Sequence, residues 1–169
     1  ERRVAVIPET VEKLVAMGFQ VIIETHAGEG IFCDDKKYRD AGAEIETDVE
    51  SLYGQADVIL KVKEPRYNER AHKYEIEMMK DGSILITFLH PAAPSNHAIV
   101  RMLKDKGVTS FTMDGIPRTS IAQGMDALTS MSTVAGYKSV LIAANNLPKF
   151  IPMMNTAIGS ITPAKCLIV

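Results

Sequence analysis

Residues 83–113, SILITFLHPAAPSNHAIVRMLKDKGVTSFTM, contain the pattern that decides the fold. A run rich in apolar residues at 83–89 predicts a strand, and the apolar spacing at 96–106 predicts a helix that ends at Gly107. A second strand-like run follows at 108–113. Strands that alternate with helices in this way are typical of α/β proteins with a parallel sheet.

The same alternation extends over the rest of the chain. Further strands are expected at residues 3–7, 19–24, 43–45, 57–63 and 166–169, and further helices at 9–18, 36–41, 49–54, 69–80 and 125–147. Because the strands are β-branched and nearly continuously apolar, we expect both faces of the sheet to be covered. The sequence therefore predicts an α/β fold with a mostly parallel, doubly wound sheet, flavodoxin- or Rossmann-like, and helices on both faces.

The composition excludes several classes of protein. The chain has 169 residues, of which 46% are hydrophobic and 24% charged, with a formal net charge of −2. These values exclude disordered and collagen-like chains, and the near-neutral charge argues against nucleic acid as a partner. Cys33 and Cys166 lie far apart and no Cys/His cluster has metal-ligand spacing, so no metal site is expected. The uncharged stretch 150–164 is too short and too polar for a membrane span.

Charged residues are unevenly distributed along the sequence. Residues 115–169 contain only five of them: Arg118, Asp126, Lys138, Lys149 and Lys165. The expected long helix at 125–147 is apolar on most sides, so we expect it to be buried nearly all round, against the first part, another copy or a further segment. A core helix and a helix shared between domains or subunits both fit this pattern.

Polar residues follow three predicted strands of the sheet. Lys63 ends one strand, His90 follows the next, and Asp114 follows the third. In an open parallel sheet, ligands bind outside the carboxyl ends of the strands, so these residues are expected to meet at one cleft. Alternatively, His90 is an ordinary core histidine and Lys63 is a solvated lysine, without a functional role.

The loop 118–126, RTSIAQGMD, places Arg118, Gln123 and Asp126 in an otherwise uncharged region. Isolated charges in apolar surroundings are costly unless they are paired or contact a ligand. An Arg118–Asp126 pair would brace the loop, and Gln123 would then offer amide groups to a polar ligand. A braced loop without a ligand is the alternative. The sequence contains no GxxxxGK[ST], HExxH, GxSxG or GxGxxG motif.

Several short motifs together resemble the alanine dehydrogenase and nicotinamide nucleotide transhydrogenase superfamily. They are RVAVIPET (3–10), AGEG (27–30), KVKEP (61–65), FLHPA (88–92), MDGIPR (113–118), MDALTSM (125–131), AGYK (135–138) and TAIGSITPAK (156–165). The resemblance runs nearly end to end. It implies an N-terminal α/β domain at 1–124 with a cofactor-facing loop at 114–126, a linking helix and connector at 125–163, and the first strand of an NAD-binding Rossmann domain at 164–169.

The loop 118–126 resembles the transhydrogenase branch, in which it reaches over the nicotinamide end of bound NAD(H). The implied cofactor-binding residues are Arg118, Gln123, Asp126 and Thr129. This branch implies the NAD(H)-binding alpha subunit of a proton-translocating NAD(P) transhydrogenase, which transfers hydride between NADH and NADP. The implied partners are a second copy, an NADP(H)-binding component and a membrane component. The implied location is cytoplasmic and peripheral to the inner membrane, or the mitochondrial matrix in a eukaryote.

Two other functions remain open. In alanine dehydrogenases the substrate site resembles Arg3, Lys63 and His90, which would bind a 2-oxo acid carboxylate, polarise the ketone and exchange a proton. That hypothesis implies NAD-dependent reductive amination of pyruvate. A non-catalytic assembly module, which docks through its charge-poor second part, is the third hypothesis. Under either enzymatic hypothesis we expect residues 1–169 alone to be inactive.

Overall fold

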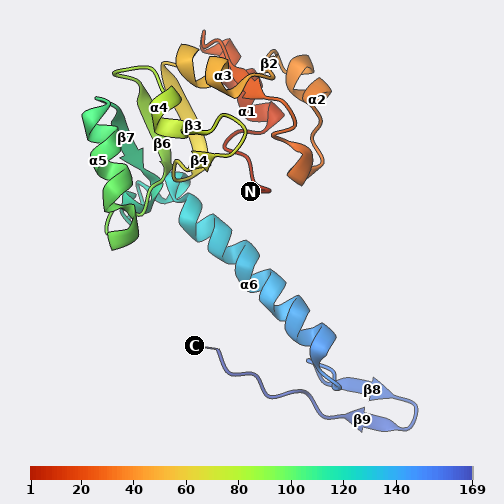
Figure 1. The fold of residues 1–169 in the computed structure, drawn as a ribbon. Helices are drawn as coiled ribbons and strands as arrows, with labels where there is room; N and C mark the ends of the chain where they lie inside the picture. Colours follow the sequence, from red (N-terminus) through yellow and green to blue (C-terminus); the bar gives the residue numbers. More distant parts are fainter. Residues whose placement is uncertain (169) are drawn as a thin grey trace. The chain divides into compact units, whose positions relative to one another are not determined.

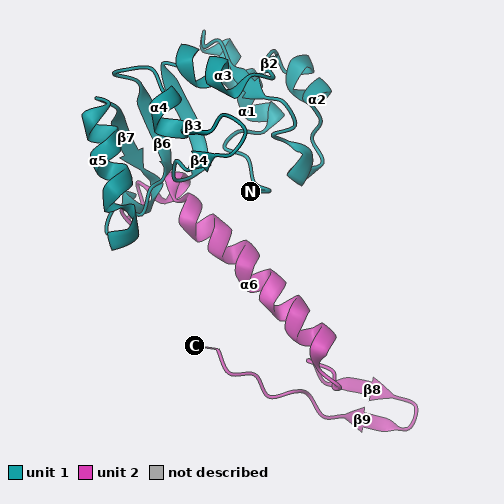
Figure 2. Ribbon diagram, in the orientation of Figure 1, with its two compact units in different colours: residues 1–116 teal, residues 117–169 magenta. Residues whose placement is uncertain are grey.

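The computed structural model describes residues 1–168 and divides into two compact units, Glu1–Ile116 and Pro117–Val169 (Figure 2). The predicted domain boundary at residue 124 stays a prediction. Single 3₁₀ turns occur at η1 (Glu29–Ile31), η2 (Pro94–Asn96), η3 (Met113–Gly115) and η4 (Gln123–Met125).

The first unit contains a three-stranded parallel sheet, in which β6 (Ile84–Phe88) lies between β3 (Val58–Lys63) and β7 (Thr109–Thr112) (Figure 1). Helix α5 (His97–Asp105) connects β6 to β7, as predicted from residues 83–113. It ends before Gly107, whose φ of +71° is a conformation that glycine adopts without strain. The parallel α/β architecture predicted from the sequence is therefore confirmed.

A second parallel pair joins β1 (Ile22–Glu24) to β2 (Glu44–Glu46). The helices near this pair are α1 (Pro8–Ala16), α2 (Asp35–Asp40) and α3 (Val49–Gln55). Aspartates begin two of them, because Asp34 accepts a hydrogen bond from the Lys37 amide and Asp48 accepts one from the Glu50 amide. Such caps satisfy backbone donors that have no partner inside the helix.

Two clusters of buried side chains stabilise the first unit. The larger cluster packs beside β3 and β6 and includes Leu85 and Met79, and the smaller one includes Val11 and Tyr38. Leu85 and Val11 have no solvent-exposed area. The three-stranded sheet and the parallel pair thus each have their own apolar core.

Residues 69–80 do not form the predicted helix. A short antiparallel pair, β4 (Tyr67–Asn68) and β5 (Lys73–Tyr74), precedes the single turn of α4 (Glu75–Met78). The rings of Tyr67 and Tyr74 pack edge to face with centroids 5.4 Å apart. This cross-strand pair stabilises a hairpin that the helical apolar spacing did not reveal.

Residues 3–7 do not form the predicted strand either. Within residues 1–168, β1 pairs only with β2 and β3 only with β6 on this side, so the parallel strands belong to two sheets. The backbone of residues 3–7 is held by a side chain instead, since the Tyr38 hydroxyl donates to the Val6 carbonyl at 3.0 Å.

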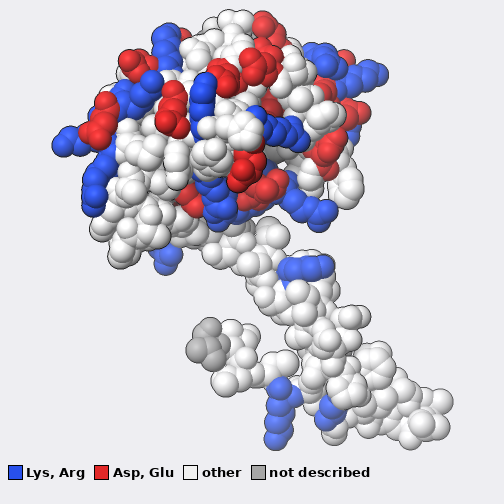
Figure 3. Space-filling view, viewed as in Figure 1, with Lys and Arg blue, Asp and Glu red and all other residues white. Residues whose placement is uncertain are grey.

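The second unit contains the predicted long helix, α6 (Ala127–Asn146), followed by an antiparallel hairpin of β8 (Met154–Thr156) and β9 (Gly159–Ile161). No residue of α6 is buried within residues 1–168, and Tyr137 is 69% exposed, so the expected burial of this helix against another copy or a further segment stays a prediction. Figure 3 shows few charged side chains on this unit and many on the first. The predicted strand at 166–169 does not form at residues 166–168, and Val169 lies outside the described residues.

None of the helices described by the structure is long and apolar enough to cross a membrane.

Candidate functional site

The carboxyl ends of β6 and β7 bring His90 and Asp114 together. The Nδ1 atom of His90 lies 2.8 Å from Oδ1 of Asp114, and the His90 amide donates to Oδ2 at 2.7 Å. The Thr112 hydroxyl donates to the same Oδ2, also at 2.7 Å. His90 has a φ of +48°, an uncommon conformation for a residue with a side chain. His90 and Asp114 therefore meet as predicted, whereas the predicted cleft that they would share with Lys63 stays a prediction, because the cavity lined by Lys63 includes neither residue.

The hydrogen bonds around Asp114 stabilise its charged form. Burial by itself would raise the pKa of this carboxyl, but the hydrogen bonds from Thr112 and the His90 amide outweigh it, so the pKa lies below its ordinary value. The carboxylate therefore acts as an acceptor, which favours the His90 tautomer that carries its proton on Nδ1.

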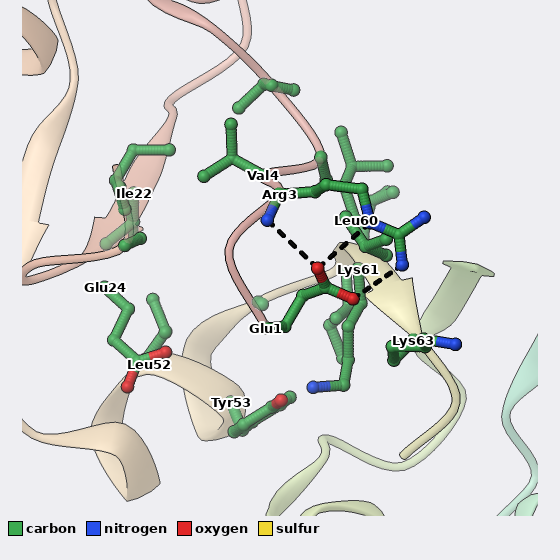
Figure 4. A pocket seen from close by; sticks show the side chains of 18 of the residues that line it. Glu1, Arg3, Val4, Ile22, Glu24, Leu52, Tyr53, Leu60, Lys61 and Lys63 are labelled. Atoms are coloured by element: carbon green, nitrogen blue, oxygen red, sulfur yellow. Dashed lines mark hydrogen bonds and ion pairs between the residues drawn. The ribbon is translucent and has the colours of Figure 1, made fainter. Parts of the chain in front are cut away.

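A cavity of about 290 Å³, here called the β1–β3 pocket, lies between those two strands (Figure 4). Its lining includes Arg3 and Lys63, two of the three residues predicted for a 2-oxo acid site, but it does not include His90. The Glu1 carboxylate contacts the Arg3 guanidinium with both oxygens, at 3.0 Å from Nε and 2.7 Å from an Nη atom. The hydrogen bonds from Arg3 lower the pKa of Glu1 to about 2. Arg3 is therefore oriented to bind a carboxylate.

A polar group that the sequence analysis missed lies beside the β1–β3 pocket. The Lys61 ammonium donates to the Glu75 carboxylate at 2.9 Å, and the other oxygen of Glu75 accepts the Arg66 amide at 2.8 Å. Burial and the nearby Glu75 charge raise the pKa of Tyr53, so its hydroxyl stays protonated. No sequence signal pointed to Glu75, because residues 69–80 were expected to be one helix.

The backbone of Lys63 is also held in place. The buried Thr87 hydroxyl donates to the Lys63 carbonyl at 2.8 Å, next to an irregularity in the pairing of β3 with β6. Since Thr87 lies on the central strand, this bond ties the position of Lys63 to the most buried part of the sheet.

In the second unit, Asp126 and Thr129 are in contact. Asp126 caps α6 by accepting the Thr129 amide at 3.0 Å and the Thr129 hydroxyl at 2.5 Å, and these bonds lower the pKa of Asp126. Arg118 lowers that pKa to a smaller extent, but it forms no ion pair with Asp126 among the described residues. The side chains of Arg118 and Gln123 are exposed and form no hydrogen bond within residues 1–168.

Potential metal ligands do not gather in the part of the chain that the structure describes, where no group of three or more His, Cys, Asp or Glu side chains has a suitable arrangement.

A model of the family described as alanine dehydrogenase/PNT, N-terminal domain, matches residues 1–135. The chain is 39% identical to an NAD(P) transhydrogenase alpha subunit polypeptide of Rhodospirillum rubrum over 99% of its length and 43% of that protein. It is 38% identical to an alanine dehydrogenase of Halomonas elongata over 88% of its length and 38% of that protein. The structure of a transhydrogenase from Sinorhizobium meliloti matches with a TM-score of 0.85 and 36% identity, over 97% of this chain and 46% of that one. The chain thus spans less than half the length of these relatives.

Proposed function

The chain belongs to the family of alanine dehydrogenase/PNT N-terminal domains, and we propose that it forms the N-terminal part of the NAD(H)-binding component of a proton-translocating NAD(P) transhydrogenase. The observation that carries the proposal is the extent of the match. The transhydrogenase relative aligns over 99% of this chain, whereas the alanine dehydrogenase aligns over 88%.

The loop before α6 supports NAD(H) as the cofactor. Asp126 is engaged in capping α6, while the exposed side chains of Arg118 and Gln123 have no hydrogen-bonding partner within residues 1–168. We assign Arg118 and Gln123 to direct contact with the nicotinamide and ribose end of NAD(H). Asp126 and Thr129 hold the loop at the helix start.

Arg118 and Gln123 would hold the nicotinamide end of NAD(H), which would supply hydride-transfer chemistry at C4 of its ring. Hydride transfer needs no acid or base at the carbon, so the role of this chain's residues would be to position the ring. Gln123, which has both amide donors and an acceptor, orients the ring. Ile121 and Met125 are apolar residues of the same loop and are 95% and 59% exposed, so they would cover the nicotinamide ring and keep water from it only when the cofactor is bound.

The proposal extends to the partners of the intact protein. The charge-poor, unburied α6 supports contact with a second copy, and thus a homodimer. Residues 164–169 would lead into the NAD-binding Rossmann domain. An NADP(H)-binding component and a membrane component complete the enzyme, at the cytoplasmic or matrix surface of the inner membrane.

The test is a titration of NADH into the intact subunit, followed by fluorescence. Loss of one hydrogen bond in Gln123→Ala should raise the Kd for NADH about tenfold. The matched control is Gln55→Ala, an exposed glutamine of the first unit, which should leave the Kd unchanged. Equal Kd values for both variants and the unsubstituted subunit would show that Gln123 does not contact NADH.

Alanine dehydrogenase-like activity is the second candidate, favoured by the carboxylate bound to Arg3 and by Lys63 in the same pocket. Under that hypothesis Arg3 binds the substrate carboxylate, Lys63 polarises the ketone and His90 exchanges a proton. NADH oxidation by pyruvate and ammonium in the intact protein, abolished by Lys63→Ala, would support it. If residues 1–169 bind a partner chain but the intact protein catalyses neither reaction, the result supports the third hypothesis, a non-catalytic assembly module.

A further inference from the structure

The ends of β6 and β7 are joined by a network of contacts, here called the His90 clamp, that consists of Leu89, His90, Thr112 and Asp114. One oxygen of the Asp114 carboxylate accepts the His90 amide and the Thr112 hydroxyl, each at 2.7 Å. The other oxygen lies 2.8 Å from Nδ1 of His90. The Thr112 hydroxyl oxygen in turn accepts the Leu89 amide at 3.3 Å. Asp114 is therefore held by residues that belong to the ends of both strands.

The His90 clamp lies directly before the loop to which we assign the cofactor. Asp114 is followed shortly by Ile116, the last residue of the first unit, and then by Arg118. The chain thus leaves the sheet from a residue whose side chain is fixed. The clamp therefore limits the directions in which residues 117–126 can continue from the sheet.

We propose that His90 is a positioning residue for NAD(H), because its contacts with Asp114 fix the start of the loop that carries Arg118 and Gln123. In this role His90 does not exchange a proton with a substrate, in contrast to its role under the alanine dehydrogenase hypothesis. This inference rests on the proposed function.

The surroundings of His90 favour positioning over proton exchange. Its ring stacks on that of Phe88, with the centroids 6.4 Å apart, and its Nδ1 atom is paired with Asp114. The β1–β3 pocket is lined by Arg3 and Lys63, the other two residues of the 2-oxo acid hypothesis, but not by His90. A residue that exchanges a proton must lie within hydrogen-bond reach of the bound substrate.

The cost of ordering the loop explains why the clamp affects binding. A backbone segment that becomes ordered only when the ligand binds lowers the affinity, so a start that is fixed beforehand raises it. The Asp114 carboxylate is charged, since its pKa lies below the ordinary value, and hydrogen bonds to a charged group are stronger than those between neutral groups. The contact from the His90 ring is therefore expected to contribute measurably to the affinity for NADH.

The test is a titration of NADH into the intact subunit that carries either His90→Asn or His90→Asp. Both replacements tolerate the φ of +48° at residue 90, but only asparagine can donate to Asp114 in place of Nδ1. His90→Asp should raise the Kd for NADH about tenfold or more, whereas His90→Asn should stay within about twofold of the unsubstituted subunit. His97→Asp makes the same charge change at an exposed histidine of α5 and should leave the Kd unchanged.

Two further measurements distinguish positioning from other roles of His90. Amide hydrogen exchange should become faster at residues 113–118 in His90→Asp and stay unchanged in β3, because the effect is local. In the complete enzyme, His90→Asn should keep the rate of hydride transfer and its pH profile. A residue that exchanges a proton typically contributes about 10²–10⁴-fold to a rate, so its replacement by asparagine would lower the rate by that amount.

Four results would overturn the proposal. The Kd for NADH is the same in His90→Asp as in the unsubstituted subunit, or His90→Asn raises it as much as His90→Asp does. Exchange becomes faster throughout the first unit in His90→Asp, which means that His90 only stabilises the fold. His90→Asn loses hydride transfer at an unchanged Kd, which means that His90 acts in the chemical step. Gln123→Ala separates this proposal from the proposed function: if it raises the Kd and His90→Asp does not, only the role of His90 is wrong, and if neither raises it, both proposals are wrong.

Discussion

The carboxylate of Asp114 contacts His90 twice, through the ring Nδ1 at 2.8 Å and through the backbone amide at 2.7 Å. One side chain at the end of β7 therefore sets both the ring orientation and the backbone conformation of a residue that follows β6. The φ of +48° at His90 is maintained by this contact, together with the stacking of the Phe88 and His90 rings at 6.4 Å.

Replacing Asp114 by Asn is expected to destabilise the first unit. The asparagine oxygen can accept one of the hydrogen bonds but lacks the charge and the second carboxylate oxygen. Because the side chain is mostly buried, at 17% exposure, we expect a loss of about 1–3 kcal/mol in the free energy of unfolding, measured by urea denaturation. Asp105→Asn, on the exposed end of α5, should change it by less than about 0.5 kcal/mol.

The effect of Asp114→Asn should also depend on pH. The folded-state pKa of Asp114 is depressed, so its contribution to stability is present above the unfolded pKa of about 3.9 and is lost as the pH falls through the lower folded value. The difference in unfolding free energy between the unsubstituted chain and the variant should therefore shrink below about pH 4. A difference that stays constant down to about pH 2 would mean that the carboxylate charge contributes nothing.

Thr87→Val should loosen the position of Lys63. Valine keeps the shape of the buried side chain but removes the hydrogen bond from the hydroxyl to the Lys63 carbonyl. We expect a cost of about 1 kcal/mol and faster amide exchange at the end of β3. Thr109→Val, on an exposed position of β7, is the matched control. Unchanged exchange at the end of β3 in Thr87→Val would contradict this assignment.

Asp126→Ala should shorten α6 from its start. Removal of the cap costs about 1 kcal/mol, and the amide of Thr129 loses its acceptor. Asp126→Asn should retain most of the cap, because asparagine is an equally good first residue for a helix. Helix content by circular dichroism and amide exchange at Thr129 should be measured for both variants. An equal loss of helix content in the two variants would show that the charge of Asp126, and not its hydrogen bond, stabilises the start of the helix.

Tyr137→Asp should weaken the proposed homodimer of the intact subunit. Tyr137 is 69% exposed on α6, so a charge there should not affect the fold of a monomer but should oppose burial in an apolar interface. We expect at least a roughly tenfold higher dissociation constant for the dimer in sedimentation equilibrium. Phe111→Asp, on an exposed position of β7, makes the same type of change outside α6 and should not affect the dimer.

Local chemistry along the chain was sufficient to predict most helices and strands. The glycine at 107 marks the end of α5, and this signal acts within a few residues. The parallel β6–α5–β7 unit could also be predicted locally, because its strands are runs rich in apolar residues while its helix has apolar residues at helical spacing. The meeting of His90 with Asp114 could also be predicted, because neighbouring parallel strands end at the same edge of a sheet.

Other features depend on contacts between residues that are distant in the sequence. The hairpin of β4 and β5 replaces a predicted helix because the Tyr67 and Tyr74 rings pack across it, and Glu75 reaches Lys61 only after the chain has folded back. Residues 3–7 are apolar enough for a strand, but a strand also needs backbone partners, and the Tyr38 hydroxyl binds this backbone instead. The exposure of α6 likewise could not be predicted from its apolar residues. Apolar side chains indicate that a surface favours burial, but they do not indicate which molecule buries it.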